Sequence, residues 1–196
     1  MNSKKAREAL LVSVLALLFA PVLAAKGFSY SFADVGYNHL SGEDFDMDGA
    51  AVDASFGVHD YVALLGGYTR GWTDGFPKDV DPSGDPDMNQ FRVGVEPHYS
   101  LLKSLDLVAD LVYVNTKFNG DRSNSDIGYI YGAGIRHRMF KWLEVRLAGE
   151  YISGDVDKAF LVLGPVIKLN RTFELSIRSS YSSDQQDYFA GLRMNF

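Results

Sequence analysis

The residues best suited to chemistry lie in one polar stretch early in the chain. His39 stands two residues before Ser41, and Glu43 or Asp44 follows as an acid that could orient the histidine. A base within hydrogen-bond reach of a hydroxyl is the arrangement by which hydrolases activate serine. This stretch therefore holds the one constellation that could make the protein a hydrolase.

The same stretch contains a second pattern, this time for a metal ion. Asp44, Asp46, Asp48 and Gly49 follow the D-x-D-x-D-G spacing that begins many calcium loops. Position twelve of the pattern is Ser55 rather than a bidentate Glu, and the segment leads into a strand rather than a helix. We interpret these aspartates as loop and turn residues exposed to water, with weak divalent-cation binding as the sharper alternative. No catalytic residues, resident metal or cofactor are expected.

Strands must position these residues, because apolar and polar side chains alternate through most of the chain. Alternation with a period of two places the two sets on opposite faces of a strand. We expect ten strands joined as five hairpins, at 27–38, 50–58, 61–70, 89–99, 105–115, 127–137, 143–152, 160–169, 173–182 and 187–196. The fold class is all-β: a transmembrane antiparallel up-and-down β-barrel of ten strands, with eight as the alternative.

The first residues have the pattern of an export signal. Lys4, Lys5 and Arg7 precede an apolar run, and small residues around Ala24 form a cleavage site. We expect residues 1–24 to be a cleaved signal peptide and residues 25–196 to form the outer-membrane β-barrel domain. The chain has no cysteine. Its formal net charge of −6 argues against nucleic acid as a partner.

Charge decides which face of each strand looks into the barrel. A Lys or Arg on the lipid face at the bilayer midplane costs about 2–4 kcal/mol, so the charged faces must look inward. The predicted lumen charge network is Asp53, Arg92, Glu96, Asp110, Arg136, Glu144, Arg146, Glu150, Glu174, Arg178 and Arg193. With Asp106, Arg138 and Lys168 added, seven acids and seven bases face inward. Because these charges balance and their side chains are long, we expect them to pair and nearly fill the lumen.

Tyrosines and loop lengths define the two ends of the barrel. Each of five strands carries a tyrosine just before a long polar loop, and tyrosine favours the boundary between lipid and water. The predicted outer aromatic girdle is Tyr37, Tyr68, Tyr113, Tyr151 and Tyr181. Short turns at one end and longer, acidic loops at the other are typical of outer-membrane barrels.

Two strands leave alternatives open. In the first, Phe28, Tyr30 and Phe32 share a face with Asp34 and lie opposite Tyr37, so either a bulge changes the register or these aromatic residues pack inward. The strand at 160–169 contains Pro165, which cannot donate a ladder hydrogen bond. We expect a bulge there. If both strands fail, the barrel has eight.

The chain resembles the small outer-membrane β-barrel family, the OmpA/OmpX-like outer membrane protein beta-barrel domain. The resemblance is carried by the signal peptide, the Gly-Tyr strand ends at Tyr37 and Tyr68, the strand 91–95 and the terminal Phe196. It implies insertion by the outer-membrane assembly machinery, which reads a C-terminal strand. The predicted assembly signal is Tyr188, Leu192, Met194 and Phe196.

The resemblance is specific for architecture and nearly silent about activity. His39 and Ser41 resemble the His-x-Ser pair of barrel lipid A deacylases, but in that family the pair stands late in the chain. We therefore expect a non-enzymatic protein of the cell outer membrane, acting structurally or in surface interaction through its acidic loops. The alternative is a narrow porin-like channel for ions or small solutes. Its expected surroundings are outer-membrane lipid and lipopolysaccharide.

Overall fold

The computed structural model describes residues 28–42, 46–72, 87–119, 124–154 and 157–196. The predicted signal peptide lies outside these residues. The described strands are β1 (Phe32–Gly42), β2 (Asp46–His59), β3 (Val62–Trp72), β4 (Asp87–Leu102), β5 (Leu105–Asn119), β6 (Asn124–Phe140), β7 (Leu143–Ser153), β8 (Lys158–Lys168), β9 (Phe173–Tyr181) and β10 (Gln185–Asn195). No helix in these ranges is long and apolar enough to cross a membrane.

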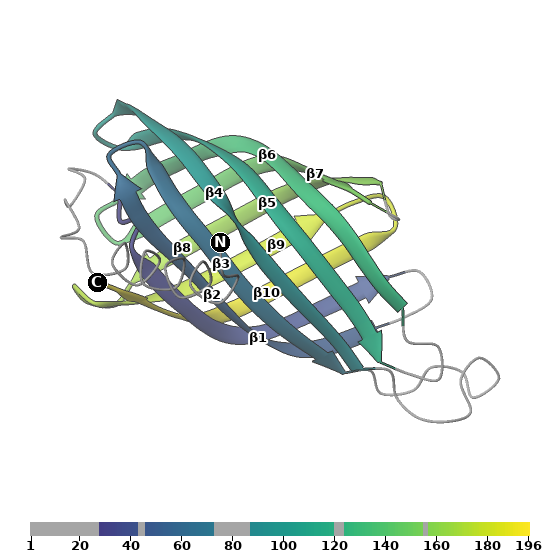
Figure 1. The fold of residues 1–196 in the computed structure, drawn as a ribbon. Coiled ribbons are helices and arrows are strands. Elements are labelled where there is room, and N and C mark those ends of the chain that lie inside the picture. The colour runs from purple at the N-terminus through teal and green to yellow at the C-terminus, as the bar shows by residue number, and fades with distance from the viewer. Residues whose placement is uncertain (1–27, 43–45, 73–86, 120–123, 155–156) are drawn as a thin grey trace, which may run out of the picture.

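The ten strands form one closed barrel (Figure 1). Each strand pairs antiparallel with its neighbours in the chain, and β1 pairs with β10 from Phe32↔Asn195 to Gly42↔Gln185. Closure satisfies the backbone groups that an open sheet edge would expose, which lipid cannot do. The predicted up-and-down barrel of ten strands is therefore confirmed, and the alternative of eight is wrong.

The two ends of the barrel differ in their connections. Four tight turns, at 60–61, 103–104, 141–142 and 169–172, join the strands at one end, which we call the periplasmic end. The other connections meet at the opposite end, called the outer end. The amide of Phe196 donates to the carbonyl of Ser31, so the C-terminus lies at the periplasmic end beside the start of β1.

The outside of the barrel is apolar and its inside is charged. Val35, Leu111, Leu161 and Leu192 are exposed on the exterior, whereas Asp106, Arg136 and Glu144 are buried within. Such an exterior is stable in lipid and unfavourable in water. A closed antiparallel barrel with this polarity is the outer-membrane architecture, and the protein is an integral outer-membrane barrel.

The first strand resolves the alternative that the sequence left open. β1 begins at Phe32 rather than at residue 27, and its pairing with both neighbours has no register shift. Phe28 and Tyr30 instead precede the strand and pack inward, with exposed fractions of 2% and 5%. The aromatic residues therefore lie in the lumen, on the same side as Asp34, and no bulge is needed.

The expected bulge at Pro165 is not found. The pairing of β8 with β9 is interrupted between Leu163↔Ser179 and Val166↔Ser176, and it continues beyond the gap in the same register. The missing N–H of proline costs a hydrogen bond but does not require an extra residue. Pro97 interrupts the β4–β5 ladder in the same way. In the described pairings the register shifts instead beside three periplasmic turns, between Gly57 and His59, Ser100 and Leu102, and Arg138 and Phe140.

Candidate functional site: the barrel lumen

The periplasmic end of the lumen is occupied by residues 28–31, which we call the N-terminal plug. The Tyr30 hydroxyl donates a hydrogen bond of 2.7 Å to Asp106 of β5. Its ring stacks on His98 of β4, with the ring centroids 3.5 Å apart. Phe28, Tyr30 and Ala63 also belong to one buried apolar cluster. The plug is thus held by an apolar contact, a stacked ring and a hydrogen bond to a buried carboxylate.

The plug contacts β2, the neighbour of β1, and also side chains from the opposite wall. β6 stands opposite β1 in the order of the ten strands. Arg136 of β6 nevertheless donates to the carbonyl of Ser29 at 3.2 Å. The guanidinium groups of Arg136 and Arg138 also lie 5.0 and 4.8 Å from the centroid of the Phe28 ring. The segment that leads into β1 is thus also held by long side chains that reach it from the opposite wall.

Two arginines hold the acids above the plug. Arg136 binds Glu144 through Nε at 2.8 Å and Nη2 at 2.5 Å, and both side chains are at least nine-tenths buried. Arg146 bridges two carboxylates, Glu96 and Asp110, on different strands. Charged side chains in a closed lumen need such partners, because a buried unpaired charge is costly.

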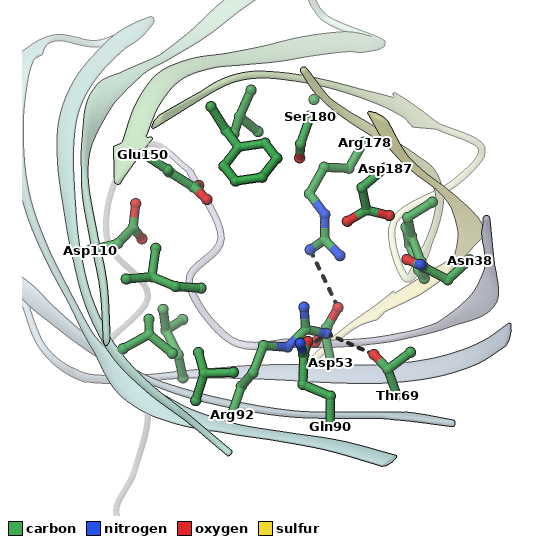
Figure 2. Close-up of a pocket in the computed structure, with 18 of the residues that line it drawn as sticks. Asn38, Asp53, Thr69, Gln90, Arg92, Asp110, Glu150, Arg178, Ser180 and Asp187 are labelled. Atoms are coloured by element: carbon green, nitrogen blue, oxygen red, sulfur yellow. Dashed lines mark hydrogen bonds and ion pairs between the residues drawn. The ribbon is translucent and has the colours of Figure 1, made fainter. Parts of the chain in front are cut away.

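A third group of charges lies around Asp53. Its carboxylate accepts from Arg92 at 2.8 Å and from Arg178 at 3.4 Å, while Arg92 also donates to Thr69 at 3.2 Å. Figure 2 shows Arg178 reaching from the opposite wall towards Asp53. The Nη2 atom of Arg178 is buried and has no hydrogen-bond partner among the described residues.

The structure contains an ion pair that the sequence did not predict. Its acid lies in the first strand, whose facing the sequence left open. Asp34 accepts two hydrogen bonds from Arg193, at 2.9 and 2.8 Å, and one from Ser176 at 3.4 Å. The guanidinium of Arg193 also lies 3.6 Å from the centroid of the Phe32 ring. A signal for this pair was present in the sequence. Arg193 was predicted to face inward and needed an acidic partner, and Asp34 lies on the same strand face as Phe32.

The remaining predicted network residues are two glutamates. Glu174 is buried and lies 3.9 Å from the Lys168 ammonium. Glu150 faces the lumen, and its carboxylate makes no hydrogen bond or ion pair with any residue in the described ranges. The structure thus places the predicted charges inside the barrel but joins them in separate groups rather than one network.

Above the plug the lumen is hollow. A cavity of about 540 Å³ extends from Arg136 and Glu144 to the outer ends of the strands, where Leu40, Phe118 and Lys158 line it. The expectation of a nearly filled lumen therefore fails for this part of the barrel. Its physical reason is the inward face of β6 and β8, where glycines add no volume: Gly128, Gly132, Gly134 and Gly164.

The tyrosines of the predicted girdle all lie on the outward face near the outer end. Tyr37, Tyr68, Tyr151 and Tyr181 are exposed, and Tyr113 is half-buried against Tyr129 at a ring distance of 5.8 Å. Just beyond this level, Lys158 lies 2.8 Å from Asp184 in the turn between β9 and β10. The hydrogen bond from Lys158 holds the pKa of the Asp184 carboxyl below its ordinary value.

The candidate chemical residues of the outer end are placed differently from the sequence expectation. Asp48 accepts a hydrogen bond from Tyr37 and lies 2.8 Å from Nδ1 of His39. No hydrogen bond joins Ser41 to His39 in the described part of the chain. Asp46 and Asp48 lie in β2 rather than in a loop, and Glu43 and Asp44 lie outside the described residues. Among those residues, no three acidic, histidine or cysteine side chains gather as a metal site.

The four residues of the predicted assembly signal lie on the outward face of β10. Leu192, Met194 and Phe196 are exposed, and Tyr188 packs edge-on against Tyr181. Phe189, which interrupted the alternation in the sequence, is 2% exposed and points inward, where Arg178 lies 5.2 Å from its ring centroid. β10 thus presents a continuous apolar strip to lipid, and side chains on its inner face contact charged side chains.

No protein-family model matches the chain, and no curated protein matches it. Solved structures do share its fold. The NanC porin is 10% identical with a TM-score of 0.52, over 84% of this chain and 100% of that one. The translocator domain of the autotransporter NalP from Neisseria meningitidis is 9% identical with a TM-score of 0.52, over 99% and 98%. Ail of Yersinia pestis is 15% identical with a TM-score of 0.40, over 84% and 99%. The chain has the fold of the small outer-membrane β-barrels.

Proposed function

We propose that this protein is a non-enzymatic barrel that does not conduct and that acts at the cell surface through its outer end. The observation that carries the proposal is the N-terminal plug, which is buried in the periplasmic end of the lumen and contacts β4, β5 and β6. The Arg136–Glu144 pair lies between the plug and the cavity. With the periplasmic side closed, the hollow lumen is a vestibule that faces outward rather than a path through the membrane.

The absence of an enzymatic role is also part of the proposal. His39 is oriented by Asp48, but Ser41 is not hydrogen-bonded to it in the described residues. Without that contact the serine has no base to accept its proton. The acidic outer connections and the residues near Tyr37 would then form the surface through which the protein meets other molecules.

A narrow pore is the second candidate, and the cavity of about 540 Å³ is the observation in its favour. Displacement of the plug would join this cavity to the periplasmic side. The likeness to the NanC porin lies in the fold alone and does not favour either candidate.

Single-channel recording of the refolded chain in a planar bilayer separates the two candidates. The unaltered barrel is expected to be silent, and a variant with Phe28→Gly and Tyr30→Gly is expected to give discrete current steps. Heat-dependent gel mobility would verify that both proteins are folded. Reproducible steps from the unaltered barrel would overturn the proposal in favour of the pore.

The proposed partners follow from the exterior. The apolar strip of β10 and its end at Phe196 suit recognition by the outer-membrane assembly machinery. The tyrosines of the outer end suit the boundary with lipopolysaccharide, since each ring can lie in lipid while its hydroxyl meets the headgroups. Depletion of the assembly machinery should lower the amount of folded barrel in the membrane.

A further inference from the structure

A patch of apolar side chains, called the apolar wall below, lies among charged residues of the same strands on one side of the lumen cavity. The side chains that form it come from β5 to β8: Val112, Val114, Ile130, Ile152, Phe160 and Val162. The lumen face of an outer-membrane barrel is ordinarily polar, and water gains little from contact with an apolar wall. Cavities of about 300–1,000 Å³ with largely apolar walls and a few polar groups are typical of small-molecule sites. The cavity of about 540 Å³ lies in this range.

Two carboxylates, Asp110 and Glu150, lie beside the apolar wall, and Asp110 is bound by Arg146. Glu150 of β7 is directly opposite Phe160 of β8 and directly opposite Gly132 of β6. It makes no hydrogen bond or ion pair with the described residues, and Figure 2 shows it pointing into the lumen beside Asp110. An acid beside an aromatic ring and next to apolar side chains is suited to a positively charged group.

Gly132 lets two carboxylates lie close together. It pairs with Asp110 on one side and Glu150 on the other, so the three residues form a row across β5, β6 and β7. A Cβ atom at Gly132 would lie 2.6 Å from Oδ2 of Asp110 and 3.1 Å from Cγ of Glu150. The two carboxylates therefore approach each other over bare backbone.

The charge balance of the cavity lining as a whole is negative. The cavity is lined by eight carboxylates and six cationic side chains. Arg146 forms its ion pairs with Glu96 and Asp110, and it interacts with Glu150 electrostatically without forming an ion pair. Arg92 and Arg178 bind Asp53 (Figure 2), and Arg178 also interacts with Glu150 without forming an ion pair.

We propose that the cavity binds an organic cation: a protonated amine or quaternary ammonium group on an aromatic or aliphatic body. The charged group would lie between Glu150 and the ring of Phe160, and the apolar body would lie along Val112 and Val162. The proposal goes beyond the surface role above and does not depend on whether the barrel conducts.

A pair of probes of matched size and opposite charge tests the proposal. Phenethylammonium and 3-phenylpropionate are titrated by calorimetry into the refolded barrel in nanodiscs of zwitterionic lipid, with empty nanodiscs as the blank. The ammonium probe is expected to bind about tenfold more tightly than the carboxylate probe, the effect of one partly desolvated cation contact. Glu150→Gln should abolish that preference.

Two further variants serve as controls. Asp187→Asn makes the same acid-to-amide change in the same cavity but on β10, away from the apolar wall, and should change affinity by less than about twofold. Phe160→Leu keeps an apolar side chain but removes the ring, and should weaken the ammonium probe severalfold. Glu150→Asp replaces Glu150→Gln if the latter does not fold, and should give an intermediate loss.

Each other outcome overturns the proposal. Equal affinity for the two probes, tighter binding of the carboxylate probe, or no heat from either would exclude an organic-cation site. Unchanged preference in a folded Glu150 variant would exclude this wall as its place. Folding of every variant is checked by heat-dependent gel mobility, so lost binding is not confused with a lost barrel.

Discussion

Tyr30 and Asp106 are 76 positions apart in the chain and are joined by a hydrogen bond of 2.7 Å in the periplasmic end of the lumen. Tyr30 precedes the first strand, whereas Asp106 lies at the start of β5. Their exposed fractions are 5% and 1%, so the contact is shielded from water. It ties the N-terminal plug to the barrel wall, and its loss should affect both stability and closure.

Tyr30→Phe should destabilise the barrel. The change keeps the ring that stacks on His98 but removes the donor to Asp106, whose other oxygen already lacks a partner among the described residues. Leaving a buried acceptor unsatisfied costs about 1–3 kcal/mol. Equilibrium unfolding in urea measures the loss. Tyr113→Phe is the control, because the Tyr113 hydroxyl makes no hydrogen bond with the described residues. An equal loss in the two variants would contradict the role of the plug contact.

Glu144→Gln should be among the most destabilising substitutions in the lumen. Arg136 would keep its charge while losing the acid that it binds at 2.5 and 2.8 Å in a buried site. Breaking one side of such a pair costs about 3–5 kcal/mol, whereas replacing both partners by apolar residues is often far less harmful. Unfolding midpoints of Glu144→Gln, Arg136→Met and the double variant Arg136→Met with Glu144→Leu would show this. Strictly additive losses would count against the pair.

Two glycines on neighbouring strands should respond oppositely to alanine. At Gly132 a Cβ atom would lie 2.6 Å from the Asp110 carboxylate, so Gly132→Ala should cost about 1–3 kcal/mol. At Gly149 a Cβ atom would meet nothing within 4 Å, and Gly149→Ala should be neutral or stabilising by about 0.4–1 kcal/mol. The comparison of their unfolding free energies tests the inward and outward assignment directly. The reverse order would mean that the faces are exchanged.

Removal of Phe196 should impair assembly in cells more than stability in vitro. The ring is 58% exposed at the periplasmic end, so its loss removes little packing, although it lies 6.4 Å from the ring of Phe56. The amount of folded barrel in isolated outer membranes should fall severalfold, while refolding of the purified truncated chain should remain nearly normal. Phe140→Ala, at another exposed periplasmic aromatic residue, is the control and should leave membrane levels close to normal. Normal levels of the truncated chain would refute the assembly role.

Ser41→Ala should change neither stability nor any property of the outer membrane lipids. The serine has no hydrogen bond to His39 in the described residues, whereas His39 lies 2.8 Å from Asp48. Mass spectrometry of lipid A from cells that carry either form would measure the effect. A difference in acylation between the two strains would revive the hydrolase interpretation.

The sequence predicted the lumen charges more accurately than their partners. Alternation placed Arg92, Arg146 and Glu150 on the charged faces of their strands. These faces were predicted to look inward because a charge in lipid is unfavourable. Which acid each arginine binds depends on strands far apart in the chain, as for Arg146 with Glu96, 50 positions away. The hollow lumen was missed because the prediction counted long charged side chains and ignored the glycines of β6.

By itself the sequence predicted the barrel, ten strands with eight as the alternative, and the direction of most strand faces, since these follow from local alternation and from the cost of charge in lipid. Only the tertiary structure decided that Phe28 and Tyr30 form a plug, because the site they fill is built from β4, β5 and β6. The same holds for the row of Asp110, Gly132 and Glu150, since it exists only in the register of three strands. Periodicity is a property of one strand, whereas a plug or a binding wall is a property of the closed barrel.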